Sequence, residues 1–136
     1  MARQWYSNLK QEPYSKWHRK FEGIAMIDVD SVEVCKTCYA PLAFIELAKD
    51  TGQQFKAYTL TKKLALKFDV PGFLVFYKVD ENDEIVKFRV KRIARTVGMI
   101  HENVSPKKWL TYLQDLQVNH QCEIDDDGKG SYGGTI

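Results

Sequence analysis

Apolar and polar positions along this chain predict short strands and helices, separated by turns. The segment from Ile24 to Cys35 is rich in β-branched and apolar residues, which indicates a strand. Phe73 to Val79 form a strongly apolar run after a Pro-Gly turn signal and predict a buried strand. Ile85 to Val90 alternate, with basic residues on one face and apolar residues on the other, so they predict a half-exposed strand.

Three segments have helical patterns. Tyr14 to Phe21 predict a short helix, because aromatic residues recur four positions apart. Thr59 or Thr61 is expected to cap a helix that continues through residue 68. Ser105-Pro106 is typical of a helix start, with an N-cap serine and a proline at the first helical position, and this helix should reach about residue 117. Its inward face is predicted to hold Trp109, Leu110, Leu113 and Leu116.

One apolar run is ambiguous. Pro41 to Ala48 fit a buried strand and also fit a helix, so periodicity leaves both open. With that segment as either element, the order of helices and strands is typical of an α/β or α+β domain. A chain of 136 residues has room for one domain. We assign it residues 1–122, with a polar arm at 1–13 and an acidic, glycine-rich tail at 123–136 that is expected to be disordered.

Composition excludes several protein classes. Apolar residues make up 44% and aromatic residues 12% of the chain, which excludes a largely disordered protein. Its apolar runs are far shorter than the roughly 20 residues of a membrane helix, and the N-terminus lacks the apolar core of a signal peptide. Three cysteines are an odd number and a low density, which argues against a secreted disulfide scaffold. The sequence therefore predicts a soluble cytoplasmic protein, in the host cytoplasm if the chain is viral.

The net charge of +2 conceals an asymmetry. Residues 123–129 carry four negative charges and one positive, which leaves a net +5 on residues 1–122. A moderately basic body suits a polyanion such as DNA, although solvated surface charge would have the same composition.

Two acidic residues interrupt the first predicted strand. Asp28 and Asp30 are two positions apart and therefore share a face. Carboxylates within an apolar strand are costly unless they are paired or bind a metal. If 41–48 is the next strand, a hairpin through the Cys35–Cys38 turn places Glu46 opposite the two aspartates. Converging carboxylates form the oxygen site that Mg²⁺ or Mn²⁺ prefers, whereas acids scattered on an exposed face need bind no metal.

An aspartate on one strand, a glutamate near the end of the next and then a helix resemble the core of the PD-(D/E)xK nuclease superfamily. The resemblance covers about residues 14–79 and is to small members in tailed phages and actinobacteria. It is carried by the runs Trp17–Arg19, Met26–Cys35, Pro41–Glu46 and Val70–Tyr77. It implies a restriction-endonuclease-like fold, with a central mixed β-sheet flanked by helices. It also implies metal-dependent cleavage of DNA, with Asp28 or Asp30 and Glu46 as Mg²⁺ or Mn²⁺ ligands.

The chain departs from the family pattern at the lysine. The pattern has lysine two residues after the glutamate, where this chain has Ala48. Lys49 is next in sequence but points to the other face of the predicted strand. Lys56 could send its amine into the site, because this lysine migrates in some members. Without a lysine to position water, the domain would bind metal or DNA but cleave poorly, so a degenerate, DNA-binding descendant stays open.

Basic residues on several elements are candidates for contacts to DNA phosphates. They are His18, Arg19, Lys62, Lys63, Lys87 and Arg89. The predicted partner is therefore DNA, with no membrane association. A homodimer and a larger phage or host assembly are also open, as is a non-enzymatic phage protein that binds host factors.

The cysteines support two further hypotheses. Cys35-Lys36-Thr37-Cys38 is similar to the thioredoxin motif, and a helix after it would lower the pKa of the first thiol and give a thiol–disulfide oxidoreductase. That alternative requires 39–50 to be a helix. Alternatively, Cys35, Cys38, His120 and Cys122 form a Cys₃His set of the kind that binds structural zinc. The zinc site requires the C-terminus to return to the hairpin, and inert reduced cysteines are the remaining interpretation.

Overall fold

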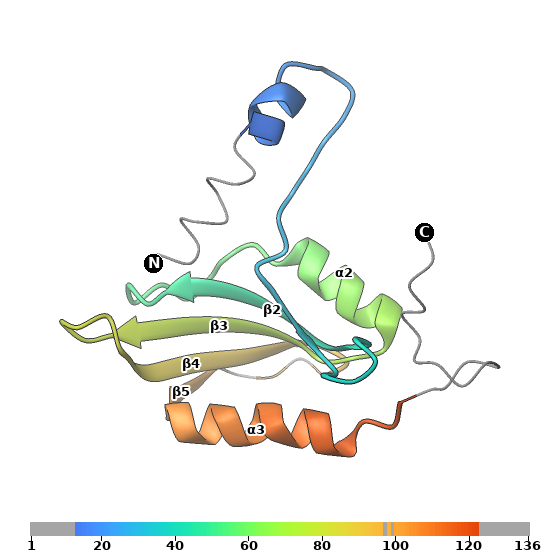
Figure 1. The fold of residues 1–136 in the computed structure, drawn as a ribbon. Coiled ribbons are helices and arrows are strands. Elements are labelled where there is room, and N and C mark those ends of the chain that lie inside the picture. The colour runs from blue at the N-terminus through green and yellow to red at the C-terminus, as the bar shows by residue number, and fades with distance from the viewer. Residues whose placement is uncertain (1–12, 97, 99, 123–136) are drawn as a thin grey trace.

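A five-stranded mixed β-sheet organises the chain (Figure 1). The computed structural model describes residues 13–96, 98 and 100–122. The strands β1 (Ser31–Val34), β2 (Pro41–Lys49), β3 (Gly72–Val79), β4 (Ile85–Ala94) and β5 (His101–Val104) lie in the sheet in chain order. Neighbours are antiparallel except β2 and β3, which are parallel and are joined through helix α2 (Thr59–Phe68). Helix α3 (Pro106–Asn119) follows β5 and covers the opposite face, so the α+β class is confirmed.

The sheet face under α2 is closely packed. Phe44 and Ala94 pack against Ala65 of α2, and Leu74, Phe76 and Ile93 continue the same buried layer. Gly72 allows the close approach, because a Cβ there would lie 3.0 Å from Cβ of Ala65. The helix expected through residue 68 is confirmed. The threonine cap is wrong, because Tyr58 is the N-cap residue and makes no side-chain capping bond.

The α3 face is aromatic and more open. Trp109 packs edge-on against Phe73 with ring centres 5.3 Å apart, and it stacks on Tyr112 at 5.5 Å. The predicted cap is confirmed, since Ser105 Oγ accepts a hydrogen bond from the Lys108 N–H at 3.0 Å. Leu110 was expected to face inward but is 52% exposed, and Tyr112 takes that place in the packing. No residue of α3 is fully buried, so the helix lies on the surface of the sheet.

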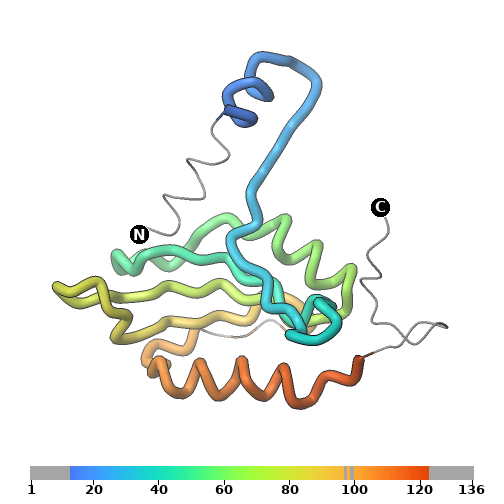
Figure 2. Tube along the Cα trace, in the orientation of Figure 1, coloured from blue at the N-terminus to red at the C-terminus, as the bar shows by residue number. Residues whose placement is uncertain are grey.

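The first predicted strand is mostly outside the sheet. β1 begins only at Ser31, because β1 pairs with β2 from Ser31 opposite Ile45 to Val34 opposite Pro41. Residues 24–30 are extended and largely exposed, and with a short helix at 13–18 they form an arm that rises from the sheet on the α2 side (Figure 2). The apolar pattern of 24–30 indicates strand propensity, but within the described part of the chain no strand pairs with this segment. We call residues 13–30 the arm.

Most of the other predicted elements are present in the structure. The segment 41–48, which fitted a strand or a helix, is strand β2. The strand predicted at 73–79 and the hairpin through the Cys35–Cys38 turn are confirmed. The short strand β5 was not predicted, since its sequence is polar and carries no strand pattern. The polar N-terminal segment predicted at 1–13 is distinct from the arm defined above. All of it except residue 13 lies outside the described residues, as does the tail predicted at 123–136.

Arg89 occupies an unexpected place. The alternation in β4 put it on an exposed basic face, but only 4% of Arg89 is exposed. Its guanidinium donates to both carboxylate oxygens of Asp50, at 3.0 and 2.9 Å, and lies 4.5 Å from the ring centre of Phe76. These hydrogen bonds from Arg89 hold the pKa of Asp50 below its ordinary value. Arg89 is therefore a buried structural residue and not a DNA contact.

Arg89→Met should destabilise the fold, because it leaves the Asp50 carboxylate without its partner while keeping most of the apolar stem. Breaking a buried ion pair costs about 3–5 kcal/mol. Lys87→Met, two positions away on the same strand, should change the free energy of unfolding by less than about 0.5 kcal/mol. Urea denaturation of both variants measures this, and equal losses would contradict the structural role of the pair.

Candidate functional site

Glu46 is a carboxylate within the closely packed sheet face. It lies on β2 beneath α2 and is 9% exposed. Thr61 of α2, which is fully buried, donates its hydroxyl to Glu46 Oε1 at 2.5 Å. The other oxygen, Oε2, lies 3.1 Å from Nζ of Lys56. Both carboxylate oxygens therefore have partners, which offsets the cost of burying the charge.

Asp30 completes this cluster from the neighbouring strand. It directly precedes β1, and the pairing of Ser31 with Ile45 brings it alongside Glu46 and Leu47. Asp30 Oδ2 accepts hydrogen bonds from the Leu47 N–H at 2.9 Å and from Lys56 Nζ at 2.6 Å. Lys56 Nζ also donates to the Leu47 carbonyl at 2.5 Å. A single cationic nitrogen is thus in contact with three oxygen atoms, from two carboxylates and one carbonyl. We call these residues the Asp30–Glu46–Lys56 cluster.

The charges of this cluster reinforce one another. Partial burial alone would raise the pKa of Asp30, but hydrogen bonds from Lys56 and the Leu47 N–H outweigh it and lower that pKa. Burial alone would lower the pKa of Lys56, but its bonds to Asp30 and Glu46 outweigh it and raise that pKa. Lys56 and Asp30 are therefore both charged at neutral pH. This ion pair lies beside the buried carboxyl group of Glu46.

The structure separates the candidates that the sequence left together. Asp28 is exposed on the arm and is not part of the cluster, because β1 begins after Asp30. Lys49 is exposed at the end of β2, three positions from Glu46 and thus on the other face. The lysine that reaches the acids is Lys56. Sequence reasoning missed Thr61 as a partner of Glu46, although its position four residues before Ala65 on the buried side of α2 is a usable signal.

The proposed DNA contacts lie on different elements. His18 and Arg19 are on the arm, Lys62 and Lys63 are on α2, and Lys87 is on β4. Arm and α2 are on the same side of the sheet (Figure 1). Side chains of the acid cluster also face this side, since Glu46 bonds to Thr61 of α2.

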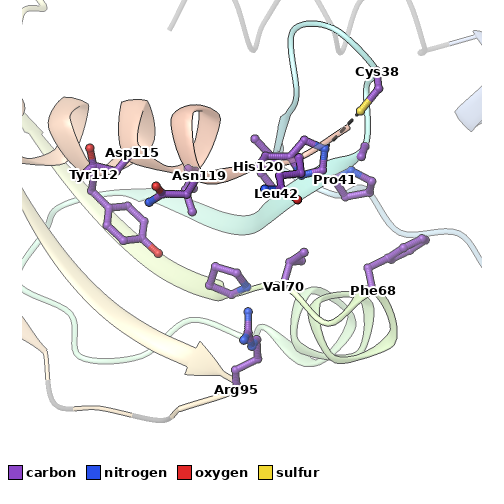
Figure 3. Close-up of a pocket in the computed structure, with 14 residues that line it drawn as sticks. Cys38, Pro41, Leu42, Phe68, Val70, Arg95, Tyr112, Asp115, Asn119 and His120 are labelled. Atoms are coloured by element: carbon purple, nitrogen blue, oxygen red, sulfur yellow. Dashed lines mark hydrogen bonds between the residues drawn. The ribbon is translucent and has the colours of Figure 1, made fainter. Parts of the chain in front are cut away.

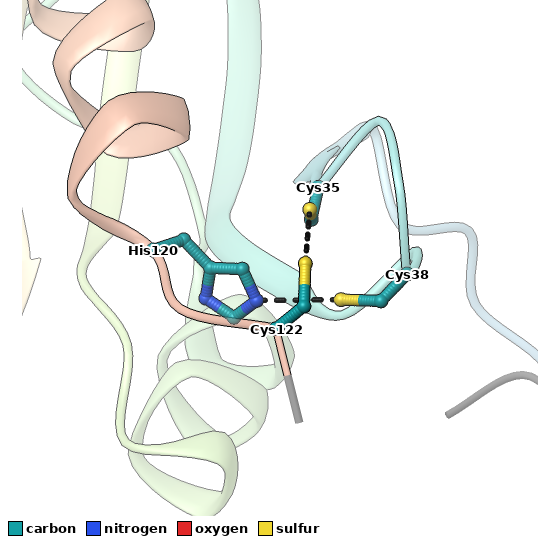
Figure 4. Close-up of side chains that lie close together, drawn as sticks. All are labelled: Cys35, Cys38, His120 and Cys122. Carbon is teal, nitrogen blue, oxygen red and sulfur yellow. Dashed lines mark hydrogen bonds between the residues drawn. The ribbon is translucent and has the colours of Figure 1, made fainter. Parts of the chain in front are cut away.

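A second cluster joins the β1–β2 turn to the chain after α3 (Figure 4). Cys35 and Cys38 are buried in the turn. Cys35 Sγ lies 3.6 Å from Cys122 Sγ, and Cys38 Sγ lies 3.3 Å from His120 Nε2. All four ligand atoms are within 4.8 Å of one another, so this Cys/His cluster could bind a metal ion such as zinc. Residues 120–122 return to the β1–β2 turn, which the sequence could not show.

Electrostatics within the Cys/His cluster differ from one thiol to another. Backbone N–H groups of Cys38 and Thr37 point at Cys35 and lower the pKa of its thiol to about 7. Hydrogen bonding to Cys35 and Cys38 raises the pKa of Cys122 to about 11. The amides of the turn, and not a helix N-terminus, lower the pKa of Cys35, since the segment after the motif is strand β2. The helix that the thioredoxin hypothesis requires is absent from 39–50, and that hypothesis is wrong on this point.

A cavity of about 700 Å³ lies beside the Cys/His cluster, between the end of α3 and the end of α2 (Figure 3). Cys38 and His120 form part of its wall, together with Phe68, Arg95 and Tyr112. The residues of the acid cluster do not line this cavity. The cavity and the Asp30–Glu46–Lys56 cluster therefore lie at different places in the molecule.

Comparisons with known proteins find one partial sequence match and no family or fold match. No protein-family model matches the sequence, and no solved structure matches it. The chain is 30% identical over 92 residues to FERM domain-containing protein A of Dictyostelium discoideum. That alignment covers 65% of this chain and 8% of the other protein, so the chain spans a small part of that relative. Among the described residues, no helix has the length and apolar character to cross a membrane.

Thr61→Val should destabilise the protein, because the isosteric change removes the hydroxyl that bonds to the buried Glu46 carboxylate. A buried acceptor that loses its donor costs about 1–3 kcal/mol. Thr59→Val, at the exposed start of the same helix, serves as the matched control and should have a small effect. Urea denaturation compares the two, and a Thr61→Val variant as stable as wild type would show that the bond contributes nothing.

Proposed function

We propose that this protein is a metal-dependent DNA nuclease of the PD-(D/E)xK type, built on a restriction-endonuclease-like core. The observation that carries the proposal is the position of Lys56 Nζ, 2.6 Å from Asp30 and 3.1 Å from Glu46. The sequence resemblance requires two acids and a lysine in one place, and its weak point was Ala48 at the usual lysine position. Lys56 supplies the missing ammonium from the loop after β2.

The ligand set of the acid cluster fits Mg²⁺ or Mn²⁺. Carboxylate oxygens of Asp30 and Glu46 and the carbonyl of Leu47 surround the position that Lys56 Nζ holds in this structure, and a divalent cation that took its place would find the oxygen ligands that such ions select. When bound, the metal would supply Lewis-acid stabilisation of charge on the scissile phosphate. Asp30 and Glu46 would hold it, and the hydroxyl of Thr61 would keep Glu46 in place.

Lys56 has the chemistry for two tasks at this site. Its ammonium, released from the carboxylates when they bind a metal, would donate hydrogen bonds to a phosphate oxygen and to the attacking water. An ammonium nitrogen donates hydrogen bonds and accepts none, so in this role Lys56 would stabilise negative charge. The arrangement supports hydrolysis of a phosphodiester, in which an oxygen nucleophile attacks and negative charge develops on phosphate.

The position of the basic residues supports DNA on the α2 side. Glu46 faces α2, and α2 carries Lys62 and Lys63. The arm, with His18 and Arg19, rises on this same side (Figure 1). A duplex on this side would place its backbone between the arm and α2, within reach of the acid cluster.

Plasmid cleavage tests the enzymatic part of the proposal. Wild-type protein should cleave DNA with Mg²⁺ or Mn²⁺ and not with EDTA. Asp30→Asn, Glu46→Gln and Lys56→Met should each lower the rate by about 100-fold or more, as expected for the loss of a group that acts in the transition state.

The chain offers close matches for two of these variants. Asp28→Asn and Lys49→Met change the residues that the sequence also nominated but that lie outside the cluster, and they should retain nearly wild-type rates. An inactive wild type that still binds DNA would replace the enzyme with a DNA-binding module. Equal losses in Asp28→Asn and Asp30→Asn would refute the assignment of the metal ligand.

Lys62→Ala combined with Lys63→Ala should weaken DNA binding in EDTA, where cleavage does not interfere. The slope of log K against log[salt] should decrease by about one for each lysine that contacts phosphate. The paired control is Lys107→Ala with Lys108→Ala on α3, across the sheet, which should leave binding nearly unchanged. Fluorescence anisotropy of a labelled duplex at several salt concentrations measures both, and equal weakening by the two pairs would contradict DNA on the α2 side.

A further inference from the structure

We propose that Cys35, Cys38, His120 and Cys122 bind one structural zinc ion, which fastens the chain after α3 to the β1–β2 turn. The inference concerns the Cys/His cluster and does not depend on nuclease activity. It assigns a role to every cysteine of the chain and to the histidine that follows α3.

The spacing of the ligand atoms suits a tetrahedral ion. Zinc–sulfur bonds of about 2.3 Å and zinc–nitrogen bonds of about 2.0–2.1 Å place tetrahedral ligand atoms about 3.5–3.8 Å apart. The Sγ atoms of Cys35 and Cys122 are 3.6 Å apart, Cys38 Sγ is slightly closer to His120 Nε2 at 3.3 Å, and all four atoms lie within 4.8 Å of one another, so an ion would need only small side-chain movements to bind all four. Three thiolates and one imidazole complete the coordination, which is typical of structural and not catalytic zinc.

The turn supplies the outer support that a zinc site requires. The backbone N–H of Thr37 donates to Cys35 Sγ at 3.4 Å, as the amides of a tight Cys-x-x-Cys turn do around a bound thiolate. The turn is closed by bonds from Cys35 N–H to the Ala40 carbonyl and from Tyr39 N–H to the Cys35 carbonyl, each at 2.9 Å. Two of the ligands are therefore placed before any metal binds.

The fold provides a reason for a clamp at this position. α3 has no fully buried residue and contacts the sheet through half-buried side chains such as Trp109, Tyr112 and Leu116. Its last turn is anchored by Gln117, whose amide donates to the Val34 carbonyl at 2.6 Å and accepts from the Lys36 N–H at 3.1 Å. The Cys/His cluster lies at this same junction (Figure 4). A bond between segments 82 positions apart in sequence closes a long loop, which is where a metal link stabilises most.

Metal analysis of the untagged full-length protein is the first test. We expect about one zinc per chain after gel filtration of wild-type protein. His120→Asn should lose most of that zinc, whereas His101→Asn, which changes an exposed histidine of β5, should keep it. Wild-type protein that binds no zinc, or equal zinc in the two histidine variants, would overturn the proposal.

Cobalt replacement in the wild-type chain avoids the case in which a variant fails to fold. Co²⁺ should give the visible bands of a tetrahedral site and thiolate-to-cobalt charge-transfer absorption. All three cysteines should resist alkylation with metal bound and react after a chelator is added. Alkylation that is equally fast with and without metal would overturn the site, as would a Cys35–Cys122 disulfide in protein purified without reductant.

Hydrogen exchange tests the clamp itself. Removing the metal should increase amide exchange in the last two turns of α3 several-fold and leave α2 nearly unchanged. Equal exchange in α3 with and without metal would show that an ion at this cluster does not fasten the helix.

Discussion

The register of β1 against β2 determines both clusters of this protein. Ser31 pairs with Ile45, so Asp30 arrives beside Glu46 and Leu47 at one end of the pair. Four residues later the same strand ends in the tight turn that holds Cys35 and Cys38. A slip of one residue would turn the side chains of β1 to opposite faces and separate Asp30 from Lys56. One short antiparallel pair therefore positions a carboxylate site at its open end and a thiol site at its turn.

The two faces of the sheet differ in their packing and in the proposed site that each one carries. Under α2 the layer is tight enough that Gly72 is needed, and a buried carboxylate is tolerated there because Thr61 and Lys56 satisfy both of its oxygens. Under α3 the helix contributes half-buried, largely aromatic side chains that pack on a buried apolar cluster of the sheet. The proposed catalytic site lies on the α2 side, and the proposed zinc lies at the junction between the β1–β2 turn and the end of α3.

Cations compensate buried or converging acids at two positions of one sheet. Arg89 pairs with Asp50 in planar, two-point geometry beneath the surface, and that pair is closed by an aromatic ring. Lys56 pairs with Asp30 and Glu46 on a flexible stem and is about one third exposed. The first pair is buried and held at two points, whereas the second has a point-like ammonium on a partly exposed stem.

Much of this protein could be predicted from local sequence. The apolar runs at 73–79 and 85–90, the Ser105-Pro106 helix start and the cysteine turn all follow from residue preferences over a few positions, and the structure confirms them. The choice of Asp30, Glu46 and Lys56 was within the predicted set, but sequence could not separate Asp28 from Asp30 or Lys49 from Lys56. Tertiary structure decided these points because each depends on a partner distant in the chain: the end of strand pairing at Ser31, the position of the loop that carries Lys56, and the return of His120 and Cys122 to the hairpin. The same reason explains Arg89, whose alternation predicted exposure and whose burial comes from Asp50, 39 positions away.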